Sequence, residues 1–327
     1  MAESKIKVSV IVPVYGVERF AERAVESMMT QTLDEVEYIF VDDCTPDSSM
    51  RIVREVVSRY PERSGSVKIL THDENRGLPA ARNTGLAAAT GKYIFHWDSD
   101  DYADAGMLES MYAIAEVSGS DFVWADWYLT FDSGSRLMRE PSATSPAEAL
   151  TLTLAGEIKY NVWNKLISRR LYTDSGILFP EGLAMGEDMT IIKLLAAARG
   201  VRHLPKAYYH YVRTNAGALT KQYSAAHLEQ LQTNTADVCA SLRAKVSERE
   251  LAWFKLNVKL PFLFTGRRSD IALWKDWYQE ADRYIMTNSY QALRTRLLQW
   301  SAAHGLSVVN MAYNMIIQKI IYGVIYR

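Results

Sequence analysis

Three acidic side chains within four residues, Asp98, Asp100 and Asp101, form the densest group of chemically capable residues in this sequence. Carboxylates this close repel one another, and a folded chain accommodates them most easily beside a cation or several hydrogen-bond donors. Mg²⁺ and Mn²⁺ are commonly held by one or two carboxylates together with substrate phosphates. The cluster could therefore help to neutralise a diphosphate leaving group. The alternative is that Asp100 or Asp101 only caps the following helix.

Further polar residues stand at similar places along the chain. Asp42 and Asp43 follow an apolar run, and either carboxylate could accept a hydrogen bond from a ribose hydroxyl or a base N–H. Gly77 and Arg82 lie around a helix start, where a guanidinium, a close backbone approach and free N–H groups all suit phosphate. The alternatives are helix capping for the two aspartates and a surface salt bridge for Arg82.

A second acidic pair, Glu187 and Asp188, precedes another apolar helix. The helix dipole alone stabilises acidic residues at such a position. A sugar transfer with inversion, however, needs a carboxylate that takes the proton of the acceptor hydroxyl. Asp188 or Glu187 is therefore the candidate for a general base outside the first cluster.

The elements that must position these residues alternate between strand and helix in the first third of the chain. We expect buried strands at residues 8–14, 37–41, 67–70 and 92–97, separated by helices at 18–31, 45–60 and 78–89. This order predicts a mostly parallel sheet flanked by helices, in which ligands bind beyond the carboxyl ends of the strands. The acidic residues at 42–43 and 98–101 fall at such ends.

The second half of the catalytic region is expected to add mixed elements, and a helical region follows it. We predict strands at 122–131 and 207–212, helices at 146–155 and 189–198, and a polar loop at 135–144. From about residue 224 the pattern is helical. We therefore expect a catalytic domain over residues 1–221 and a C-terminal helical region over residues 222–327.

Composition and charge narrow the class of protein. The 327 residues have a formal net charge of −1, and 48% of them are hydrophobic, as in an ordinary soluble protein. Cys44 and Cys239 are the only cysteines, and their wide spacing suits a reducing compartment. Without a signal peptide or a clean apolar run of membrane-spanning length, we expect a cytoplasmic location.

The C-terminal region is basic and ends in an apolar stretch. From Lys221 onward there are 14 Lys and Arg against 8 Asp and Glu. Asn310, Asn314, Gln318 and Lys319 interrupt residues 306–326 at intervals of three to four, as in an amphipathic helix. Such a helix could lie on the inner face of the plasma membrane. The alternative is packing on the catalytic domain or within a homo-oligomer.

An ordered set of motifs carries a family resemblance over roughly residues 6–215. The motifs are VIVPVY at 10–15, VDDCTPD at 41–47, NRG at 75–77, ARN at 81–83, WDSDD at 97–101, WNKL at 163–166, FPEG at 179–182 and ED at 187–188. Together they resemble family 2 glycosyltransferases, which implies the α/β GT-A fold, a Rossmann-like sheet. Gly16 stands where that family often has Asn, and residues 44–46 stand where Gly-Ser-Thr is common.

The resemblance implies an inverting hexosyltransferase that moves a sugar from a nucleotide-sugar, a UDP-sugar first of all, to a glycan or lipid-linked hydroxyl. It implies a role in bacterial surface polysaccharide or glycolipid synthesis, with Mn²⁺ or Mg²⁺ held by Asp100. Asp188 would be the catalytic base beside Glu187. The acceptor side would include Trp163, Asn164 and Lys165. The donor-binding residues would be Pro13, Val14, Tyr15, Glu18, Asp42, Asp43, Gly77, Arg82, Asp98 and Ser99.

Other assignments stay open on the sequence. His210 could be a further metal ligand or a histidine packed in its aromatic stretch. A sugar nucleotidyltransferase would want a glycine-rich, basic loop after the first strand, where Tyr15-Gly16-Val17-Glu18 stands instead. A catalytically silent glycan-binding or scaffold protein would be expected to lack one of the acidic clusters. No basic–aromatic pattern indicates nucleic acid.

Overall fold

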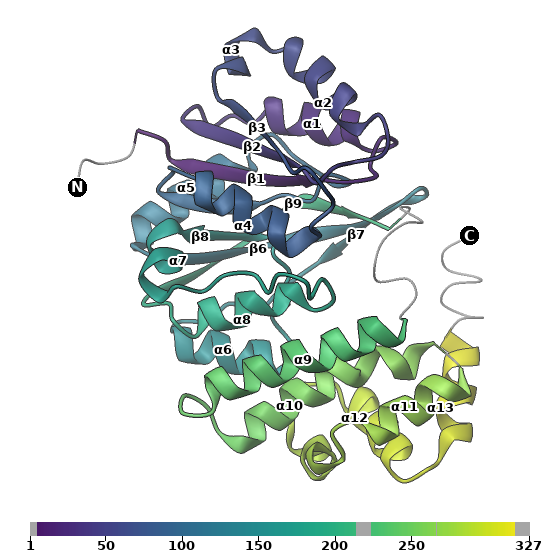
Figure 1. Ribbon diagram of the computed structural model, residues 1–327. Coiled ribbons are helices and arrows are strands. Elements are labelled where there is room, and N and C mark those ends of the chain that lie inside the picture. The colour runs from purple at the N-terminus through teal and green to yellow at the C-terminus, as the bar shows by residue number, and fades with distance from the viewer. Residues whose placement is uncertain (1–4, 214–223, 266, 318–327) are drawn as a thin grey trace. The chain divides into compact units, whose positions relative to one another are not determined.

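The computed structural model describes residues 5–213, 224–265 and 267–317 of the chain (Figure 1). In this part a nine-stranded sheet has the order β3-β2-β1-β4-β8-β6-β9-β5, and β7 pairs with β6. The strands are β1 (Val8–Val14), β2 (Val36–Asp42), β3 (Val67–Thr71), β4 (Tyr93–His96), β5 (Tyr102–Ala103), β6 (Phe122–Phe131), β7 (Gly134–Met138), β8 (Lys165–Ser168) and β9 (Val201–Val212).

The sheet is mixed and mostly parallel. β1 lies between β2 and β4, and β2 pairs with β3, all in parallel. β8 runs antiparallel to both β4 and β6, whereas β6 and β9 are parallel to each other. All seven residues of β1 are buried, as expected for a strand covered on both faces. This is the GT-A-like arrangement that the sequence predicted, with the carboxyl ends of β1, β2 and β4 at one edge.

Helices flank this sheet. They are α1 (Ala21–Met29), α2 (Ser49–Ser58), α3 (Pro61–Ser64), α4 (Leu78–Ala88), α5 (Met107–Ser118), α7 (Arg169–Ser175) and α8 (Thr190–Leu195). α4 packs on β1 and β2, and α5 packs on β6 and β9. At Gly85 of α4 an added Cβ would lie 2.4 Å from the Ile11 Cγ2 atom, so only glycine allows this close approach to β1.

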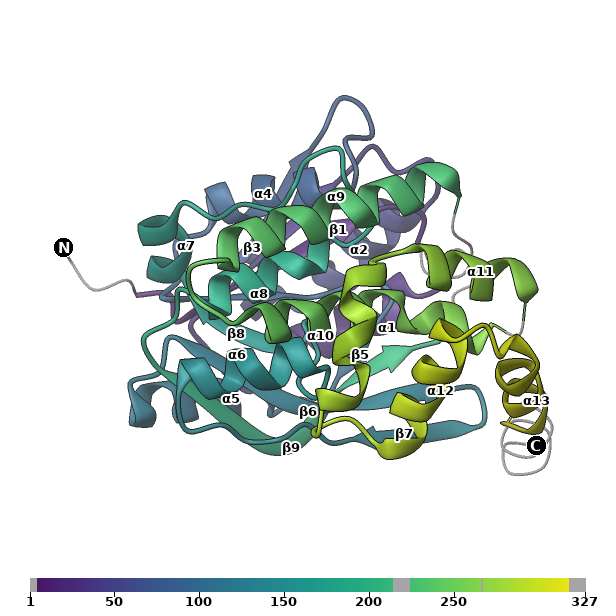
Figure 2. The ribbon, with the colours of Figure 1, turned by 90° about the horizontal axis from the view of Figure 1, so that it is seen from below.

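The described residues divide into two compact units. One comprises the residues up to Pro146 together with Tyr160–Val238, and the other comprises Ala147–Lys159 and the residues from Cys239 onward. The second unit is helical, and in it α11, α12 and α13 pack on one another (Figure 2). Its elements and the helix leading to it are α6 (Pro146–Ala155), α9 (Ala225–Leu242), α10 (Glu248–Lys259), η3 (Leu260–Phe264), α11 (Arg268–Asp276), η4 (Gln279–Thr287), α12 (Leu293–Ala303) and α13 (Ser307–Ile317).

The C-terminal helix predicted over residues 306–326 is seen as α13, and its remainder lies outside the described residues. Among the helices that the structure describes, none is long and apolar enough to cross a membrane. The boundary expected at residue 221 stays a prediction.

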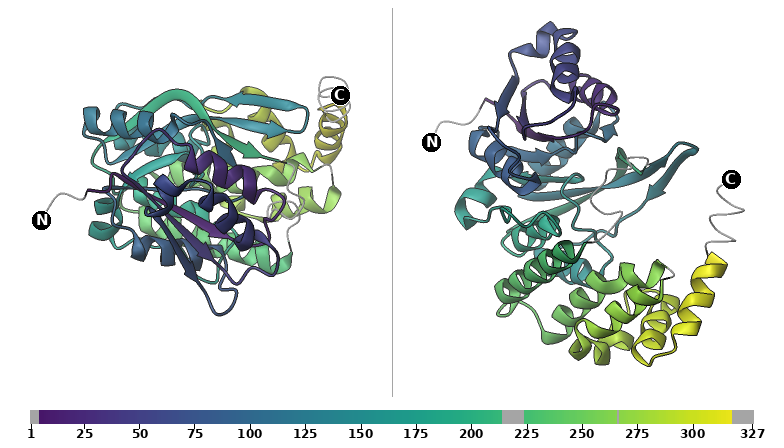
Figure 3. Two further views of the ribbon diagram at one scale, coloured as in Figure 1. Left: turned by 90° about the horizontal axis from the view of Figure 1, so that it is seen from above. Right: turned by 45° about the vertical axis from the view of Figure 1, so that its right-hand side comes forward.

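Two expectations for the second half of the sheet were wrong. A loop was expected over residues 135–144, but only residues 139–144 lie outside a helix or strand. Residues 135–138 belong to β7, which forms a hairpin with β6 whose tip projects from the sheet (Figure 3). The residues of β7 are mostly exposed, so they show no alternation of apolar and polar residues. The strand expected at 207–212 begins earlier, at Val201. Its first half was missed because Pro205 and Lys206 interrupt the pattern, at a register shift opposite Ala125 and Asp126. Proline suits such an irregularity, and it hides the strand in the sequence.

Candidate active site

The loops that follow β1 and β2 are tied to each other by hydrogen bonds. The backbone N–H groups of residues 16–18 donate in turn to Thr45 Oγ1 at 2.9 Å, Ser49 Oγ at 3.0 Å and Asp47 Oδ2 at 3.0 Å. In return, Glu18 Oε2 accepts from the Ser48 N–H at 3.1 Å. Glu18 thus fastens the rim of the predicted donor site, and residues 45–49 supply its side-chain acceptors.

The three residues expected to form the rim differ in what they can offer. Pro13 and Val14 are buried in β1, so their side chains do not reach the surface. Tyr15, the next residue, is exposed. In this structure a flat base or sugar could therefore meet the Tyr15 ring but not the side chains of Pro13 and Val14.

The two aspartates at the end of β2 have different surroundings. Asp43 is buried, and its carboxylate accepts hydrogen bonds from the N–H groups of Arg76 and Gly77, each at 2.8 Å. His72 Nδ1 lies 2.7 Å from the same carboxylate. Asp42 is partly exposed, and its Oδ1 accepts from the Thr45 N–H at 2.9 Å. Asp43 therefore shapes the start of α4, and Asp42 is the more accessible carboxylate.

Arg82 joins three of the predicted motifs at one point. This side chain of α4 is only 1% exposed. Its Nη2 donates to Asp98 Oδ1 at 2.8 Å, and its Nε donates to Glu187 Oε1 at 3.2 Å. Within the described part of the chain, its Nη1 is buried without a hydrogen-bond partner. One guanidinium thus links the acidic cluster after β4 to the acidic pair more than 80 residues further along.

The acidic pair lies in η1 (Glu187–Met189), a short 3₁₀ turn before α8. Glu187 is buried, and Asp188 is partly exposed. Burial and the charge of Glu187 raise the pKa of Asp188 well above its ordinary value, although Arg82 opposes this. Burial also raises the pKa of Glu187, against the pull of Arg82. A carboxylate with a raised pKa is a better proton acceptor near neutral pH.

The cluster after β4 contains two partly exposed carboxylates, Asp98 and Asp100, and one buried carboxylate, Asp101. Asp98 is held by Arg82, and its N–H donates to Tyr209 Oη at 3.1 Å. Asp101 is buried and accepts from the Val212 N–H at 2.7 Å, and burial with the charges of Asp100 and Asp98 raises its pKa. Ser99 is buried, whereas Asp100 is partly exposed. Asp98 and Asp100 are therefore the carboxylates of this cluster that a ligand could reach.

This cluster fits a divalent cation that is completed by a substrate. Among the described residues, no three His, Cys, Asp or Glu side chains are grouped so that they could hold a metal ion. Mg²⁺ and Mn²⁺ need no such protein cage, because they commonly use one or two carboxylates plus phosphate oxygens. Burial raises the pKa of Asp101, and so do the negative charges of Asp100 and Asp98, which a cation would offset.

His210 does not support the metal-ligand role that the sequence left open. Its ring is stacked between Tyr102, at a centroid distance of 4.3 Å, and Tyr128, at 4.7 Å. Its Nδ1 lies 3.1 Å from Thr130 Oγ1, and its Nε2 lies 3.6 Å from Asp104 Oδ1. Both ring nitrogens thus have protein neighbours, and the packed alternative describes this histidine.

Comparisons with known proteins agree with this geometry. Residues 9–185 match the family described as Glycosyl transferase family 2. This chain belongs to that family. Glycosyltransferase EpsJ of Bacillus subtilis is 34% identical over 235 residues, which cover 69% of this chain and 66% of that relative. The relative is described as uncharacterized, and the present chain spans just under two thirds of its length.

Solved structures show the same fold for this family 2 glycosyltransferase. S. aureus TarS, in a complex with UDP-GlcNAc, superposes with a TM-score of 0.69 at 22% identity, covering 94% of this chain and 89% of that one. A mannosyltransferase from Pyrobaculum calidifontis, in a complex with GDP-Man and Mn²⁺, has a TM-score of 0.55 at 17% identity, covering 96% and 86%. At these identities the likeness shows the fold.

The residues expected on the acceptor side are not available at the surface of this glycosyltransferase. Trp163 is buried, with its ring stacked between Tyr209 at 4.8 Å and Tyr211 at 5.1 Å. Asn164 and Lys165 are also buried, and Lys165 Nζ donates to Asn164 Oδ1 at 2.6 Å. Burial lowers the pKa of Lys165 to about 8. These three side chains support the sheet, and the structure does not place them in direct contact with an acceptor.

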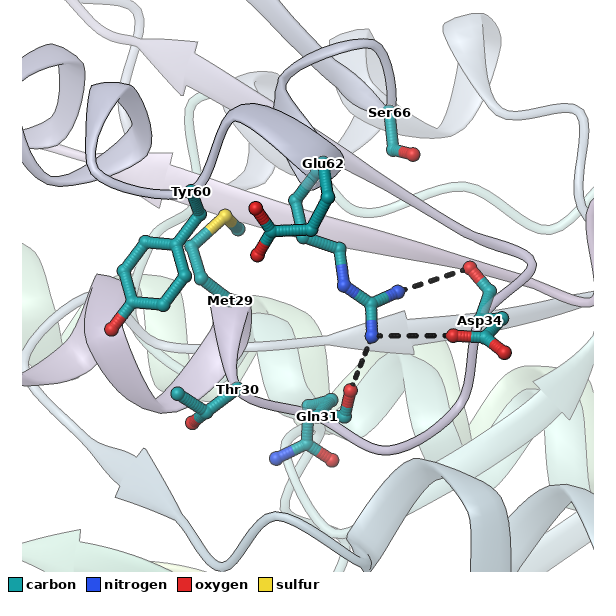
Figure 4. Close-up of a pocket in the computed structure, with 8 residues that line it drawn as sticks. Met29, Thr30, Gln31, Asp34, Tyr60, Glu62 and Ser66 are labelled. Carbon is teal, nitrogen blue, oxygen red and sulfur yellow. Dashed lines mark hydrogen bonds and ion pairs between the residues drawn. The ribbon is translucent and has the colours of Figure 1, made fainter.

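A pocket of about 530 Å³ lies elsewhere, at the opposite edge of the sheet (Figure 4). Its lining includes Asp34 and Ser66, which precede β2 and β3, and therefore falls at the amino ends of these strands. Arg63 donates there to the backbone carbonyls of Gln31 at 2.6 Å and Leu33 at 3.0 Å. This pocket takes no part in the site, because ligands of such sheets bind at the carboxyl edge.

Sequence reasoning missed residues that act on the site through others. Tyr209 holds the backbone of Asp98, and His72 holds the Asp43 carboxylate. Both partners are more than 25 residues distant along the chain, and no local pattern signals such pairs. The motifs therefore predict where the candidate site lies, whereas the residues that support it are visible only in the fold.

Proposed function

We propose that this family 2 glycosyltransferase moves a sugar from a UDP-sugar to a hydroxyl group of a glycan or lipid-linked acceptor, with inversion at the anomeric carbon. The Arg82 bridge between Asp98 and Glu187 is the observation that supports this most directly. It brings a donor-side carboxylate and an acidic pair suited to base catalysis to the two ends of one guanidinium. A capping cluster or a surface salt bridge would not require this buried link.

On the donor side, each role follows from accessibility. Tyr15 and Asp42 would meet the base and ribose, since both are at least partly exposed at the carboxyl edge. Asp98 would contact the ribose. The start of α4 favours the diphosphate, and the buried Arg82 would support this site by holding Asp98. UDP is the first nucleotide to test, because the TarS structure contains a UDP-sugar.

Asp100 would hold Mn²⁺ or Mg²⁺ together with the diphosphate oxygens. The cation, when bound, supplies positive charge to the departing nucleotide diphosphate. The P. calidifontis mannosyltransferase structure, which contains Mn²⁺, makes this ion the natural first choice. We do not assign His210 to the metal site, because its ring is stacked between Tyr102 and Tyr128.

Asp188 would act as the general base. Its carboxylate takes the proton of the acceptor hydroxyl while that oxygen forms a bond to the anomeric carbon. The bond from this carbon to the diphosphate oxygen breaks at the same time, and its electron pair leaves with the UDP. Glu187 stays on Arg82 and maintains the position of Asp188. The raised pKa of Asp188 favours this proton transfer.

Replacing Asp188 by Asn tests the base assignment. We expect Asp188→Asn to reduce kcat by at least about 100-fold, the lower range for a lost general base, while UDP binding remains. The matched control is Asp276→Asn, an exposed aspartate of α11. Sugar transfer and nucleotide affinity should be measured in parallel. A D188N enzyme that retains most of its kcat would remove Asp188 from this role.

A donor screen tests the substrate class separately. Nucleotide release is measured for UDP-, GDP- and dTDP-sugars with Mn²⁺, with and without a chelator. We expect UDP-sugars to be turned over preferentially and the chelator to stop the reaction. Activity that is unchanged by the chelator would contradict the role of Asp100, and a preference for GDP-sugars would contradict UDP.

A further inference from the structure

The helices α12 and α13 are arranged with their polar sides inward. Asn310 of α13 is fully buried at 0% exposure, and its Nδ2 donates to the Leu298 carbonyl at 3.0 Å. Ser301 Oγ of α12 donates to Asn310 Oδ1 at 3.2 Å. Asn314 is also buried and donates to the Leu263 carbonyl. These bonds fix which side of α13 faces the second unit.

The apolar sides of the same helices consequently face outward. Val308 is 73% exposed and Val309 is 51% exposed. We call the outward set the apolar face, and its members on α12, α13 and the turn between them are Leu293, Leu297, Trp300, Leu306, Val308, Val309, Met315 and Ile316. A helix on the surface of a soluble protein normally shows the opposite arrangement. A set of exposed apolar residues on two helices that pack on each other indicates a binding surface.

The charges of the segment that carries the apolar face favour one of its candidate occupants. Residues 286–317 contain Arg294 and Arg296 but no Asp or Glu. Arg294 is exposed and lies one turn from Leu297 on α12. Against a second copy of the same face, these arginines would meet one another without a carboxylate in the stretch to pair with. An anionic lipid surface instead provides both apolar depth and negative charge.

Two exposed aromatic side chains fit the same environment. Trp300 is exposed on α12 and stacks on His304 at a centroid distance of 4.1 Å, and Tyr290 is exposed just before this helix. Amphipathic aromatic rings favour the boundary between lipid headgroups and acyl chains. The polar edges of both rings can stay in the headgroup layer while the aliphatic residues enter deeper.

We propose that the apolar face of α12 and α13 docks this protein onto an anionic lipid bilayer surface. The face uses only residues of the second unit, so the proposal is independent of the transfer reaction. Docking requires no membrane-spanning segment, because the helices lie along the interface with their inward polar bonds intact. It would hold the protein where a lipid-linked acceptor is concentrated.

Co-sedimentation of the full chain with vesicles tests the proposal. The vesicles contain either phosphatidylcholine alone or equal parts of phosphatidylcholine and phosphatidylglycerol. We expect binding to the mixed vesicles, and we expect the double variant Val308→Glu with Val309→Glu to bind at least about ten-fold more weakly. Arg294→Gln should weaken binding to the anionic vesicles about five-fold, the share of one basic residue, and should have little effect on phosphatidylcholine alone.

The control is Val117→Glu, a change of the same kind at a 90% exposed position of α5 in the first unit. It should bind the vesicles like the wild type. Circular dichroism should confirm that all variants are folded, as expected for exposed positions. Equal sedimentation of the double variant and the wild type would overturn the proposal. Failure of the wild type to sediment with the vesicles would also overturn it. If the wild type were then found to be a dimer and the double variant a monomer, the apolar face would be assigned to contact with a second copy.

Discussion

Asn83 and Phe179 exchange two hydrogen bonds across the site: Asn83 Nδ2 donates to the Phe179 carbonyl at 2.9 Å, and the Phe179 N–H donates to Asn83 Oδ1 at 2.9 Å. The adjacent Arg82 holds Glu187, so two neighbouring residues of α4 fasten both ends of the segment from 179 to 187. Arg76 adds a third tie to this segment, because its Nη2 lies 3.1 Å from Glu181 Oε2. The helix that faces the donor thus also positions the proposed base.

We predict that Asn83→Ala lowers kcat more than it lowers donor affinity. The substitution leaves the Phe179 N–H and carbonyl without their partner, which should cost about 1–3 kcal/mol of stability. A displaced base should cost up to about 100-fold in kcat, as expected for a misplacement of about 1 Å. The control is Asn75→Ala, an exposed residue with a single bond of 3.4 Å to Asp43. Similar kcat values for both variants would contradict the positioning role.

The pH dependence of transfer should follow Asp188. Its pKa is raised by burial and by the charge of Glu187, so activity should rise with pH through a value above the ordinary range of an aspartate. Glu187→Gln removes that charge, lowers the Asp188 pKa, and should shift the rise to lower pH. The profile of kcat/KM against pH measures this shift. Glu62→Gln, at an exposed position of α3, should leave the profile unchanged.

Stability should depend on the Arg82 bridge in a way that pH reveals. Arg82→Met leaves the Asp98 and Glu187 carboxylates without their shared cation, and losing one partner of a buried ion pair costs about 3–5 kcal/mol. The pKa of Glu187, which Arg82 lowers in the wild type, should rise in the folded variant, so the folded state binds protons more tightly than the unfolded state. The loss in the free energy of unfolding should therefore be complete at a pH above the raised pKa. It should become smaller as the pH falls toward the ordinary range of carboxyl pKa values. Urea unfolding at neutral and mildly acidic pH checks this, and a deficit that does not change with pH would contradict it.

The fold was largely predictable because its main strands have strong patterns. β1 and β6 have the predicted bounds, since each is a run of apolar residues ended by polar ones. The carboxyl edge followed from the order of strands and helices. β7 and the start of β9 were not predictable, because one lacks an apolar pattern and the other contains Pro205. A pattern of apolar residues in the sequence indicates which residues are buried. It does not reveal β7 and the start of β9, because these segments become strands by pairing with β6.

The site was predictable in location but only partly in detail. The order of the motifs does not predict that the Asp43 carboxylate accepts hydrogen bonds from backbone N–H groups while Asp42 is partly exposed. This difference depends on the path of the loop before α4. Likewise, helical periodicity gives α13 two faces without saying which one is inward. The bonds of Asn310 decide that, and they come from α12.

Cys44 should be a source of strain in the donor loop. Its φ of 57° is in the left-handed region, which costs a non-glycine residue about 1–2 kcal/mol, and its side chain is exposed. Cys44→Gly should therefore raise the free energy of unfolding by about 0.5–1 kcal/mol, after the entropy that glycine adds to the unfolded chain. The same change at Cys239, inside α9, should be destabilising by about 1 kcal/mol. A loss of stability in both variants would show that the loop needs the cysteine side chain.

Metal dependence should separate Asp100 from His210. Asp100→Asn removes the carboxylate proposed to hold the metal, and we expect Mn²⁺-dependent binding of UDP to weaken by at least about 10-fold, as for the loss of a group that fixes a metal site. His210→Phe keeps the flat ring between Tyr102 and Tyr128. It should therefore leave the dependence on Mn²⁺ unchanged.

Titration of UDP at a series of Mn²⁺ concentrations measures this for both variants. The stacking of His210 offers a reason why the two should differ. Its Nε2 is 3.6 Å from Asp104 and its Nδ1 is 3.1 Å from Thr130, so a metal would have to displace one of these neighbours. Burial also lowers the pKa of His210, which favours the neutral form of the ring. If His210→Phe weakened Mn²⁺-dependent binding as much as Asp100→Asn does, the ring would have to leave its stack when the donor binds, and the metal site would include it.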